Sequence, residues 1–270
     1  MKQVHKWRQF LYEERMGPYQ IYCDMDGVLV DFVKGALEQM NRDVQDATLD
    51  DKEPSGRYNA LGKLKLTMER AGIETLEEKH IEKNSDGPRE LRKVAIKYMY
   101  ERLWDDEEFW ANLSWMPGGR SLWETIRSYN PYILTAPMGE GSERGKQRWI
   151  DKNLNPQPSK IFMSHDKYNW ARDGDQKNVL IDDFVSNIKP WRKKGGIAIH
   201  HDHEDIQQTL TSLSELGFKT KPIPNEHAED NSAEEKEESL PLLENRRAHS
   251  RLTIGPGGNK RLRRRNPQKK

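Results

Sequence analysis

The sequence predicts an α/β protein, and two observations carry that prediction. Short apolar stretches have the length of buried strands, and they begin near Ile21, Tyr132, Ile161, Val179 and Ile197. Segments with helical patterning lie between them, as at residues 121–129 and 145–154. Strands that alternate with helices are typical of a parallel sheet whose connections cross over its faces. We therefore expect a Rossmann-like parallel sheet.

Composition limits what kind of protein this is. The chain has 270 residues, of which 33% are charged, and its net charge is +1, which suits a soluble protein with one large domain and an appendage. No stretch approaches the roughly 20 apolar residues that span a bilayer, and the first residues lack a signal peptide's apolar core. The single cysteine, Cys23, cannot form an internal disulfide. We expect a cytoplasmic protein without a membrane partner.

The chain divides into four parts. Residues 1–19 form an arm with the pattern of a short amphipathic helix, and residues 20–32 and 116–219 form the α/β core. Residues 33–115 are rich in lysine and glutamate, with helical patterning and no convincing strand; they are too many for a loop and predict a helical domain. The acidic and then basic tail, residues 220–270, has too little apolar sequence to fold alone and is expected to be disordered.

Two aspartates follow the first expected strand. Asp24 and Asp26 lie two residues apart, so in an extended chain their side chains start on the same face. Gly27 then allows a sharp turn because it has no Cβ. The carboxyl ends of strands are where open α/β sheets bind ligands. A solvated turn is the alternative, but the apolar residues on both sides favour a site for Mg²⁺ and a phosphate.

Further polar residues end other expected strands. Thr135 ends the stretch that begins at Tyr132, and Asp182 and Asp183 end the stretch that begins at Val179. The family resemblance given below requires a lysine near the end of a strand, and Lys160 and Lys167 are the two candidates for it. Lys160 enters its strand at the amino end, on the order of 15 Å from the carboxyl edge at about 3.3 Å per residue. Lys167 follows that strand, so we choose Lys167.

The order of these residues resembles the four motifs of the haloacid dehalogenase superfamily of phosphohydrolases. The resemblance implies the Rossmann-like haloacid dehalogenase fold, with residues 33–115 as a helical cap. It also implies a Mg²⁺ cofactor, with Asp24, the backbone carbonyl of Asp26, Asp182 and Asp183 as the metal-binding set. Asp24 would be the nucleophile and Asp26 the general acid and base, while Thr135 and Lys167 would contact the phosphoryl group.

A second resemblance is narrower. Residues 109–113 with the turn at 116–119, the segment 133–137 and the pair Asp166-Lys167 are similar to the 5′(3′)-deoxyribonucleotidases, phage-encoded relatives included. This likeness covers nearly all of residues 20–218 and implies a 5′-nucleotidase-type phosphoric monoester hydrolase, located in the host cytoplasm if the chain is viral. One departure is Ala136, because that family often has a phosphate-binding serine directly after the motif that corresponds to residues 132–135.

Aromatic residues gather at the end of the expected cap. Phe109 and Trp110 have two interpretations: they pack the cap onto the core, or they stack on a planar substrate. The substrate-binding candidates are therefore Phe109, Trp110 and Ala136. Packing is the more common role of such residues.

Other reactive residues receive structural interpretations. Cys23 precedes Asp24 on a buried strand and points to the opposite face, which predicts a core residue. The cluster His200, His201 and His203 lacks diagnostic ligand spacing and is interpreted as a solvated strand end. Arg144, Lys146 and Arg148 are interpreted as the wet face of a helix, from which one side chain could reach phosphate.

The sequence therefore predicts a Mg²⁺-dependent phosphatase of nucleoside monophosphates, preferentially deoxyribonucleotides, acting through an aspartyl phosphate. The alternative substrate is a nucleic-acid 3′ end. A non-catalytic role is the alternative from a different class: the basic cluster Arg261–Arg265 would bind nucleic acid or a larger assembly. The complete set of acids favours the enzyme.

Overall fold

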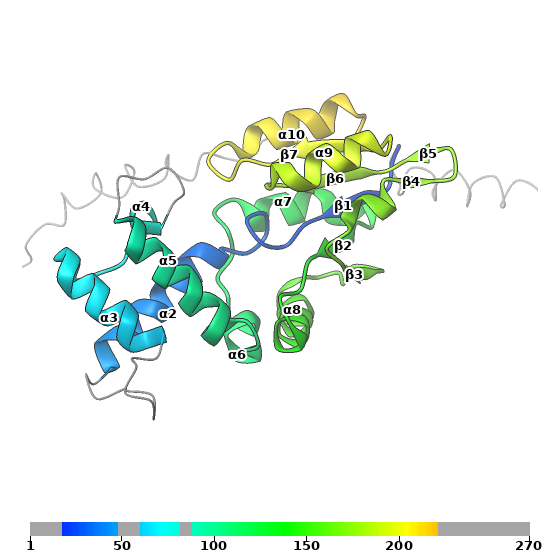
Figure 1. Cartoon of the computed structure of the whole chain (residues 1–270). Coiled ribbons are helices and arrows are strands. Elements are labelled where there is room, and N and C mark those ends of the chain that lie inside the picture. Colours follow the sequence, from blue (N-terminus) through cyan, green and yellow to red (C-terminus); the bar gives the residue numbers. More distant parts are fainter. Residues whose placement is uncertain (1–17, 48–59, 82–87, 221–270) are drawn as a thin grey trace, which may run out of the picture. The chain divides into compact units, whose positions relative to one another are not determined.

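A computed structural model describes residues 18–47, 60–81 and 88–220 (Figure 1). The N-terminal arm lies outside the described residues except for Pro18 and Tyr19, and so does the tail except for Thr220. The expectations of an amphipathic arm and a disordered tail therefore concern residues outside the description.

The centre of the fold is a five-stranded sheet with the order β3-β2-β1-β6-β7, in which each neighbouring pair is parallel. The strands are β1 (Ile21–Cys23), β2 (Tyr132–Thr135), β3 (Ile161–Met163), β6 (Val179–Asp182) and β7 (Ile197–His200). Each begins at the residue expected from the sequence. The prediction of an α/β fold with a parallel sheet is confirmed.

Both faces of this sheet are covered, and the period of two in each strand explains how. Ile21 and Cys23 of β1 belong to one apolar cluster, whereas Tyr22 between them belongs to another. The same alternation separates Ile181 from Leu180 in β6. Burial on both faces is the usual environment of a parallel sheet. Cys23 is accordingly a core residue, as expected.

Helices of the core follow the strands (Figure 1). They are α7 (Gly119–Ile126) with the 3₁₀ turn η2 (Arg127–Tyr129), α8 (Glu140–Asn153), the 3₁₀ turn η3 (Lys167–Trp170), α9 (Val185–Lys193) and α10 (Ile206–Glu215). A small antiparallel hairpin, β4 (Arg172–Asp173) and β5 (Gln176–Lys177), precedes β6. Within the described residues, the structure has no helix with the length and apolar character needed to cross a membrane.

Between β1 and α7, the named secondary-structure elements of the described residues are all helical. This segment contains α2 (Phe32–Asp46), α3 (Ala60–Ala71), α4 (Glu78–Ile81), α5 (Arg89–Tyr98), the π-helical turn η1 (Met99–Leu103) and α6 (Glu107–Ala111). Its buried residues form an apolar cluster of their own, which includes Met40, Leu64 and Tyr98. Phe32 and Phe109 contact both this cluster and the main core.

Close packing joins α6 to the core helix α8. A Cβ at Gly145 would lie 2.5 Å from the carbonyl oxygen of Glu107 and 2.5 Å from Trp110 Cβ, so only glycine permits this approach. Arg144 and Arg148 of α8 form ion pairs with Glu107. The last helix of the segment is therefore held against the core.

Candidate active site

The carboxyl end of β1 places the first acid of the site. The Asp24 backbone N–H donates to Ile181 O at 2.9 Å, which extends the β1–β6 ladder by one residue. Asp24 Oδ1 accepts from the Met25 N–H at 2.7 Å and from Lys167 Nζ at 2.7 Å. Within the described residues, Oδ2 accepts no hydrogen bond, so it is the oxygen left to meet a ligand. The side chain is buried but not closed off.

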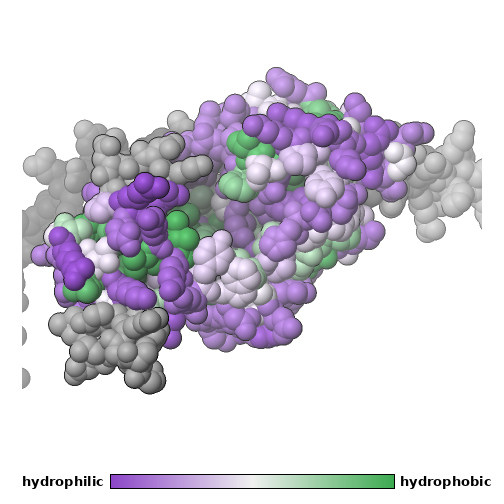
Figure 2. Space-filling model, viewed as in Figure 1, coloured by the Kyte–Doolittle hydropathy of each residue, from purple (hydrophilic) through white to green (hydrophobic). Residues whose placement is uncertain are grey.

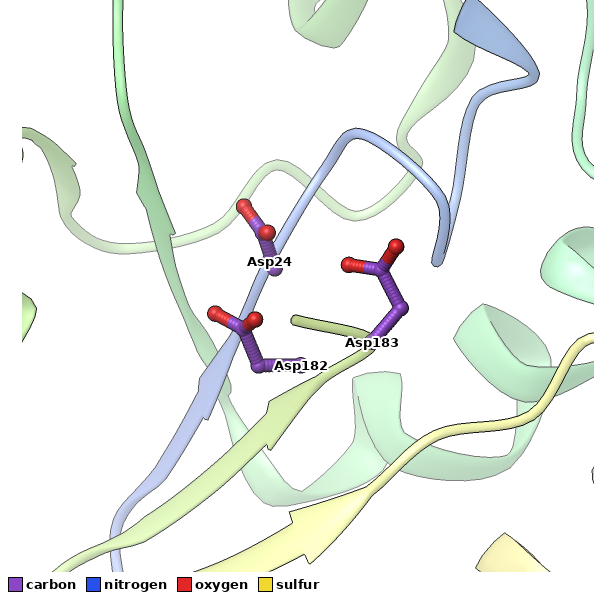
Figure 3. A group of neighbouring side chains, drawn as sticks. All are labelled: Asp24, Asp182 and Asp183. Carbon is purple, nitrogen blue, oxygen red and sulfur yellow. The ribbon is translucent and has the colours of Figure 1, made fainter. Parts of the chain in front are cut away.

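Asp182 and Asp183 come from the end of the adjacent strand β6 and face Asp24 (Figure 3). One oxygen from each of the three carboxylates lies within 4.8 Å of the others. Gly27 makes room for this approach: its φ is 74°, and a Cβ there would lie 2.2 Å from Asp183 Oδ2. The two neighbouring strands and the turn at Gly27 thus bring three carboxylates together.

Lys167 lies between two of these acids. Its Nζ is 2.7 Å from Asp24 Oδ1 and 2.7 Å from Asp182 Oδ2, and the side chain is 2% exposed. Burial by itself would lower the pKa of Lys167, but the two carboxylates outweigh it and the pKa is raised. The ammonium is therefore charged and fixed. Lys160, the candidate set aside, is exposed and lies over the Tyr132 ring.

Electrostatics at the cluster favour a bound cation. Burial, followed by repulsion from Asp24, raises the pKa of Asp182 to about 6. The same two causes raise the pKa of Asp183 to about 7. Asn187 donates to both carboxylate oxygens of Asp182 at 3.0 and 3.1 Å, which fixes that side chain. The single positive charge of Lys167 does not balance the negative charges of three neighbouring carboxylates.

Asp26 belongs to a second group at the same edge. Its Oδ2 accepts from Lys146 Nζ at 2.5 Å, whereas its Oδ1 is buried and has no hydrogen-bond partner among the described residues. Burial raises the pKa of Asp26, and Lys146 opposes this effect. The Asp26 carboxylate is not part of the three-acid cluster, and the role of its backbone carbonyl as a metal ligand stays a prediction.

Lys146 corrects the interpretation of its helix as a solvated face. The side chain is fully buried, and its Nζ donates to Asp26 Oδ2, Thr135 Oγ1 and Ala136 O. Only Arg144 and Arg148 are exposed as expected. A signal was present in the sequence, because Lys146 lies three and four residues before the buried Trp149 and Ile150 on one helix face.

A cavity of about 250 Å³ opens at this edge of the sheet. Its lining includes Asp24, Asp26, Asp183 and Lys167, together with Ala136. Thr135 does not line it: the side chain is fully buried, and its hydroxyl accepts from Lys146 Nζ at 2.9 Å. The acids, the lysine and Ala136 are thus brought together around one space, while Thr135 lies behind it.

Phe109 and Trp110 do not line this cavity. Trp110 is 1% exposed, its Nε1–H donates to Leu103 O, and its ring stacks on Phe32 at a centroid distance of 5.0 Å. Phe109 packs edge-on against the same two rings. Of the two interpretations, the contacts support packing: these rings fill the contact between the helical segment and the core.

One histidine also departs from expectation. His200 and His203 are exposed, as predicted for a solvated strand end, but His201 is 2% exposed. Its Nδ1 bonds with Thr209 Oγ1 at 2.9 Å, and its Nε2 has no partner among the described residues. Burial lowers the pKa of His201 to about 4. The bond to Thr209 joins the ring to α10, a contact that the charged neighbours in the sequence did not indicate.

The donor set fits Mg²⁺. Mg²⁺ prefers oxygen ligands and few carboxylates, with retained waters. Asp24, Asp182 and Asp183 each offer a carboxylate oxygen within 4.8 Å of the others, and Asp24 and Asp183 line the cavity. Burial raises the pKa of Asp182 and Asp183 and so favours their protonated forms. A cation beside them would stabilise the ionised forms instead.

Comparison of folds returns hydrolases of the haloacid dehalogenase group. A phosphate- and sodium-bound hydrolase of this family from Deinococcus radiodurans matches with a TM-score of 0.39 at 13% identity, over 77% of this chain and 100% of that chain. A haloacid dehalogenase-like protein from Streptococcus pneumoniae matches with a TM-score of 0.37 at 14% identity, over 67% and 82%. L-2-haloacid dehalogenase from Xanthobacter autotrophicus, carrying covalently bound chloropropionic acid, matches with a TM-score of 0.35 at 11% identity, over 77% and 93%. No protein-family model matches the sequence, and the search of curated proteins returned no match.

Proposed function

We propose that this chain is a metal-dependent phosphatase of the haloacid dehalogenase superfamily, with Asp24 as nucleophile. The observation that carries the proposal is the arrangement around the cavity: Asp24 has a free oxygen beside two further acids, and a charged lysine is fixed between them. A phosphate monoester carries nearly two negative charges, so a carboxylate needs such positive charge beside it before it can approach phosphorus.

Asp24 Oδ2 is the oxygen that attacks. The bonds from Met25 N–H and Lys167 Nζ both end on Oδ1, and they orient the carboxylate without occupying Oδ2. The Asp24–phosphorus bond forms as the ester P–O bond breaks, which leaves an aspartyl phosphate. Lys167 offsets part of the negative charge that the transferring group brings. Thr135 lies behind the cavity, where its hydroxyl accepts from Lys146 and so helps to position the ammonium that holds Asp26.

Asp26 supplies and then accepts the proton. Its raised pKa favours the protonated form that a general acid needs when the leaving alkoxide departs. Water then attacks phosphorus and gives a proton to Asp26, the Asp24–phosphorus bond breaks, and inorganic phosphate is released. The Lys146 ammonium holds Asp26 Oδ2, which fixes the carboxyl group at the edge of the cavity.

Mg²⁺, when bound, would offset phosphoryl charge and polarise a phosphoryl oxygen. Asp24 and Asp182 would hold it with the backbone carbonyl of Asp26, and Asp183 would hold it directly or through water. The substrate part of the proposal is a nucleoside monophosphate, preferentially a deoxyribonucleotide. It is supported by the sequence resemblance to deoxyribonucleotidases and not by any fold comparison.

A panel of phosphate monoesters tests both parts. Purified protein with Mg²⁺ should hydrolyse p-nitrophenyl phosphate and should favour deoxynucleoside monophosphates over sugar phosphates. EDTA should abolish turnover and Mg²⁺ should restore it, whereas Ca²⁺ should support it poorly because its coordination is larger and more flexible. Full activity in chelator would overturn the metal-dependent mechanism, and a preference for sugar phosphates would overturn the substrate class alone.

A further inference from the structure

Phe184 is an aromatic residue that neither the fold nor the proposed chemistry uses. It is 63% exposed and belongs to the lining of the acidic cavity. The visible face of the molecule is mostly hydrophilic, with small apolar patches (Figure 2). Fully burying a phenylalanine contributes about 1.5–3 kcal/mol, and this position forgoes most of that stabilisation.

Exposed apolar residues are common singly, so exposure alone assigns no role. What distinguishes Phe184 is its fixed backbone. Its N–H donates to Asp182 Oδ1 at 2.9 Å, and its carbonyl oxygen accepts from the N–H of Asn187 at 2.8 Å at the start of α9. The chain at Phe184 is therefore held by one of the acids of the site, while the side chain remains accessible.

The other aromatic residue of the lining is already occupied. The Phe32 ring stacks on Trp110 at an interplanar angle of 13° and packs edge-on against Phe109. Within the described residues, Phe184 has no such ring partner and adjoins Asp183 directly in the chain. Val33 and Met116 add apolar surface to the same lining. A ligand whose phosphate meets Asp24 thus finds an open aromatic face at the cavity.

We propose that Phe184 is the specificity-determining residue that packs against the leaving group, and that the group it selects is a flat one, the nucleobase of a nucleoside monophosphate. This inference rests on the proposed function. A phenylalanine ring has no hydrogen-bonding group, so it recognises the face of a base and not its edge. Base-on-aromatic stacking is tolerant of sequence, and purines and pyrimidines should both be accepted.

The test compares two esters that differ only in the base: thymidine 5′-monophosphate and 2-deoxyribose 5-phosphate. Phe184→Ala should lower kcat/KM for the nucleotide by about tenfold, as expected for the loss of one stacking contact. It should leave the sugar phosphate unchanged. Phe184→Trp should keep the preference for the nucleotide. Val185→Ala is the matched control, because Val185 is also exposed but does not line the cavity.

Each other outcome is decisive. Equal losses on both esters would mean that Phe184 supports the acids and does not contact the leaving group, and no loss on either ester would remove it from the site. If the parent protein cleaves both esters equally well, the inference fails while the phosphatase stands. If the folded protein cleaves neither ester nor p-nitrophenyl phosphate, the proposed function itself fails.

Discussion

Two buried lysines at the same sheet edge are placed by different means and hold different acids. Lys167 follows β3 and bridges Asp24 and Asp182, with both distances at 2.7 Å. Lys146 comes from the middle of α8 and holds Asp26 together with Thr135. The lysines therefore divide the site into a side that holds the proposed nucleophile, Asp24, and a side that holds the proposed proton carrier, Asp26.

The two lysines also differ in how their ammonium groups are placed relative to the cavity. On the Lys167 side, one ammonium is shared by two carboxylates and lines the cavity together with one of them, Asp24. On the Lys146 side, the ammonium is fully buried, does not line the cavity and is satisfied by three oxygens. We therefore expect Lys167 to contribute to the hydrolysis of every substrate. Lys146 should contribute through Asp26, and so mainly where the leaving group needs a proton.

The largest effect should come from removing the Lys167 charge. Lys167→Met should lower kcat/KM by about thousandfold for alkyl and aryl phosphates alike, the upper range for losing one donor that stabilises charge in the transition state. Lys160→Met is the matched control, since Lys160 is exposed away from the cavity, and it should leave activity unchanged. Steady-state kinetics on thymidine 5′-monophosphate and p-nitrophenyl phosphate measure this. A loss confined to one ester would break the division of roles.

Lys146→Met should have a smaller and selective effect. We expect kcat/KM for thymidine 5′-monophosphate to fall about hundredfold, the low end of general acid catalysis. For p-nitrophenyl phosphate, whose leaving group needs little protonation, the loss should stay below about tenfold. Lys152→Met on the exposed face of the same helix is the control. Equal losses on both esters would place Lys146 with Lys167 instead of with Asp26.

The smallest effect on catalysis should come from His201, where stability is the expected readout. The unfolded state binds a proton below pH 6.5, but the folded state resists it until about pH 4. The free energy of unfolding should therefore fall as the pH drops through this window, by up to about 3 kcal/mol, and level off below it.

His200, Asp202 and His203 are the charged neighbours that modulate this titration, and the main cause is burial. Urea unfolding at several pH values measures the slope. His201→Gln should flatten it, whereas His203→Gln, at an exposed position, should preserve it. An unchanged slope in His201→Gln would assign the pH dependence to other groups.

The sheet could be predicted from the sequence because each strand contains a short apolar run, and the runs at the centre of the sheet are buried on both faces. The first residues of β1 and β6 illustrate this: Ile21 and Val179 begin runs in which every residue is buried. The predicted ends of the helices were less accurate. The stretch expected at 145–154 is α8, which begins at Glu140, because Ser142 Oγ accepts from the N–H groups of Met138 and Gly139 and starts the helix earlier.

The acids of the site could be anticipated because they lie where strands end: Asp24 follows β1, Asp182 is the last residue of β6 and Asp183 follows it. Residues placed by packing between distant segments could not be anticipated. Trp110 is buried through contacts with Phe32 and with α8, which no local pattern encodes. Lys146 differs, because a local pattern did indicate its burial. Its charge nevertheless favoured a solvent-exposed position, since the sequence did not reveal the partner that holds it.

The central claim is that Asp24 takes the phosphoryl group, and trapping that group tests it most directly. Protein mixed with Mg²⁺ and p-nitrophenyl phosphate, quenched in acid during turnover and digested, should yield the peptide that contains Asp24 with one added phosphoryl group by mass spectrometry. Asp26→Asn should increase its amount by slowing hydrolysis, and Asp24→Asn should abolish both the adduct and turnover. Turnover that persists in Asp24→Asn, or an adduct on another residue, would contradict the account.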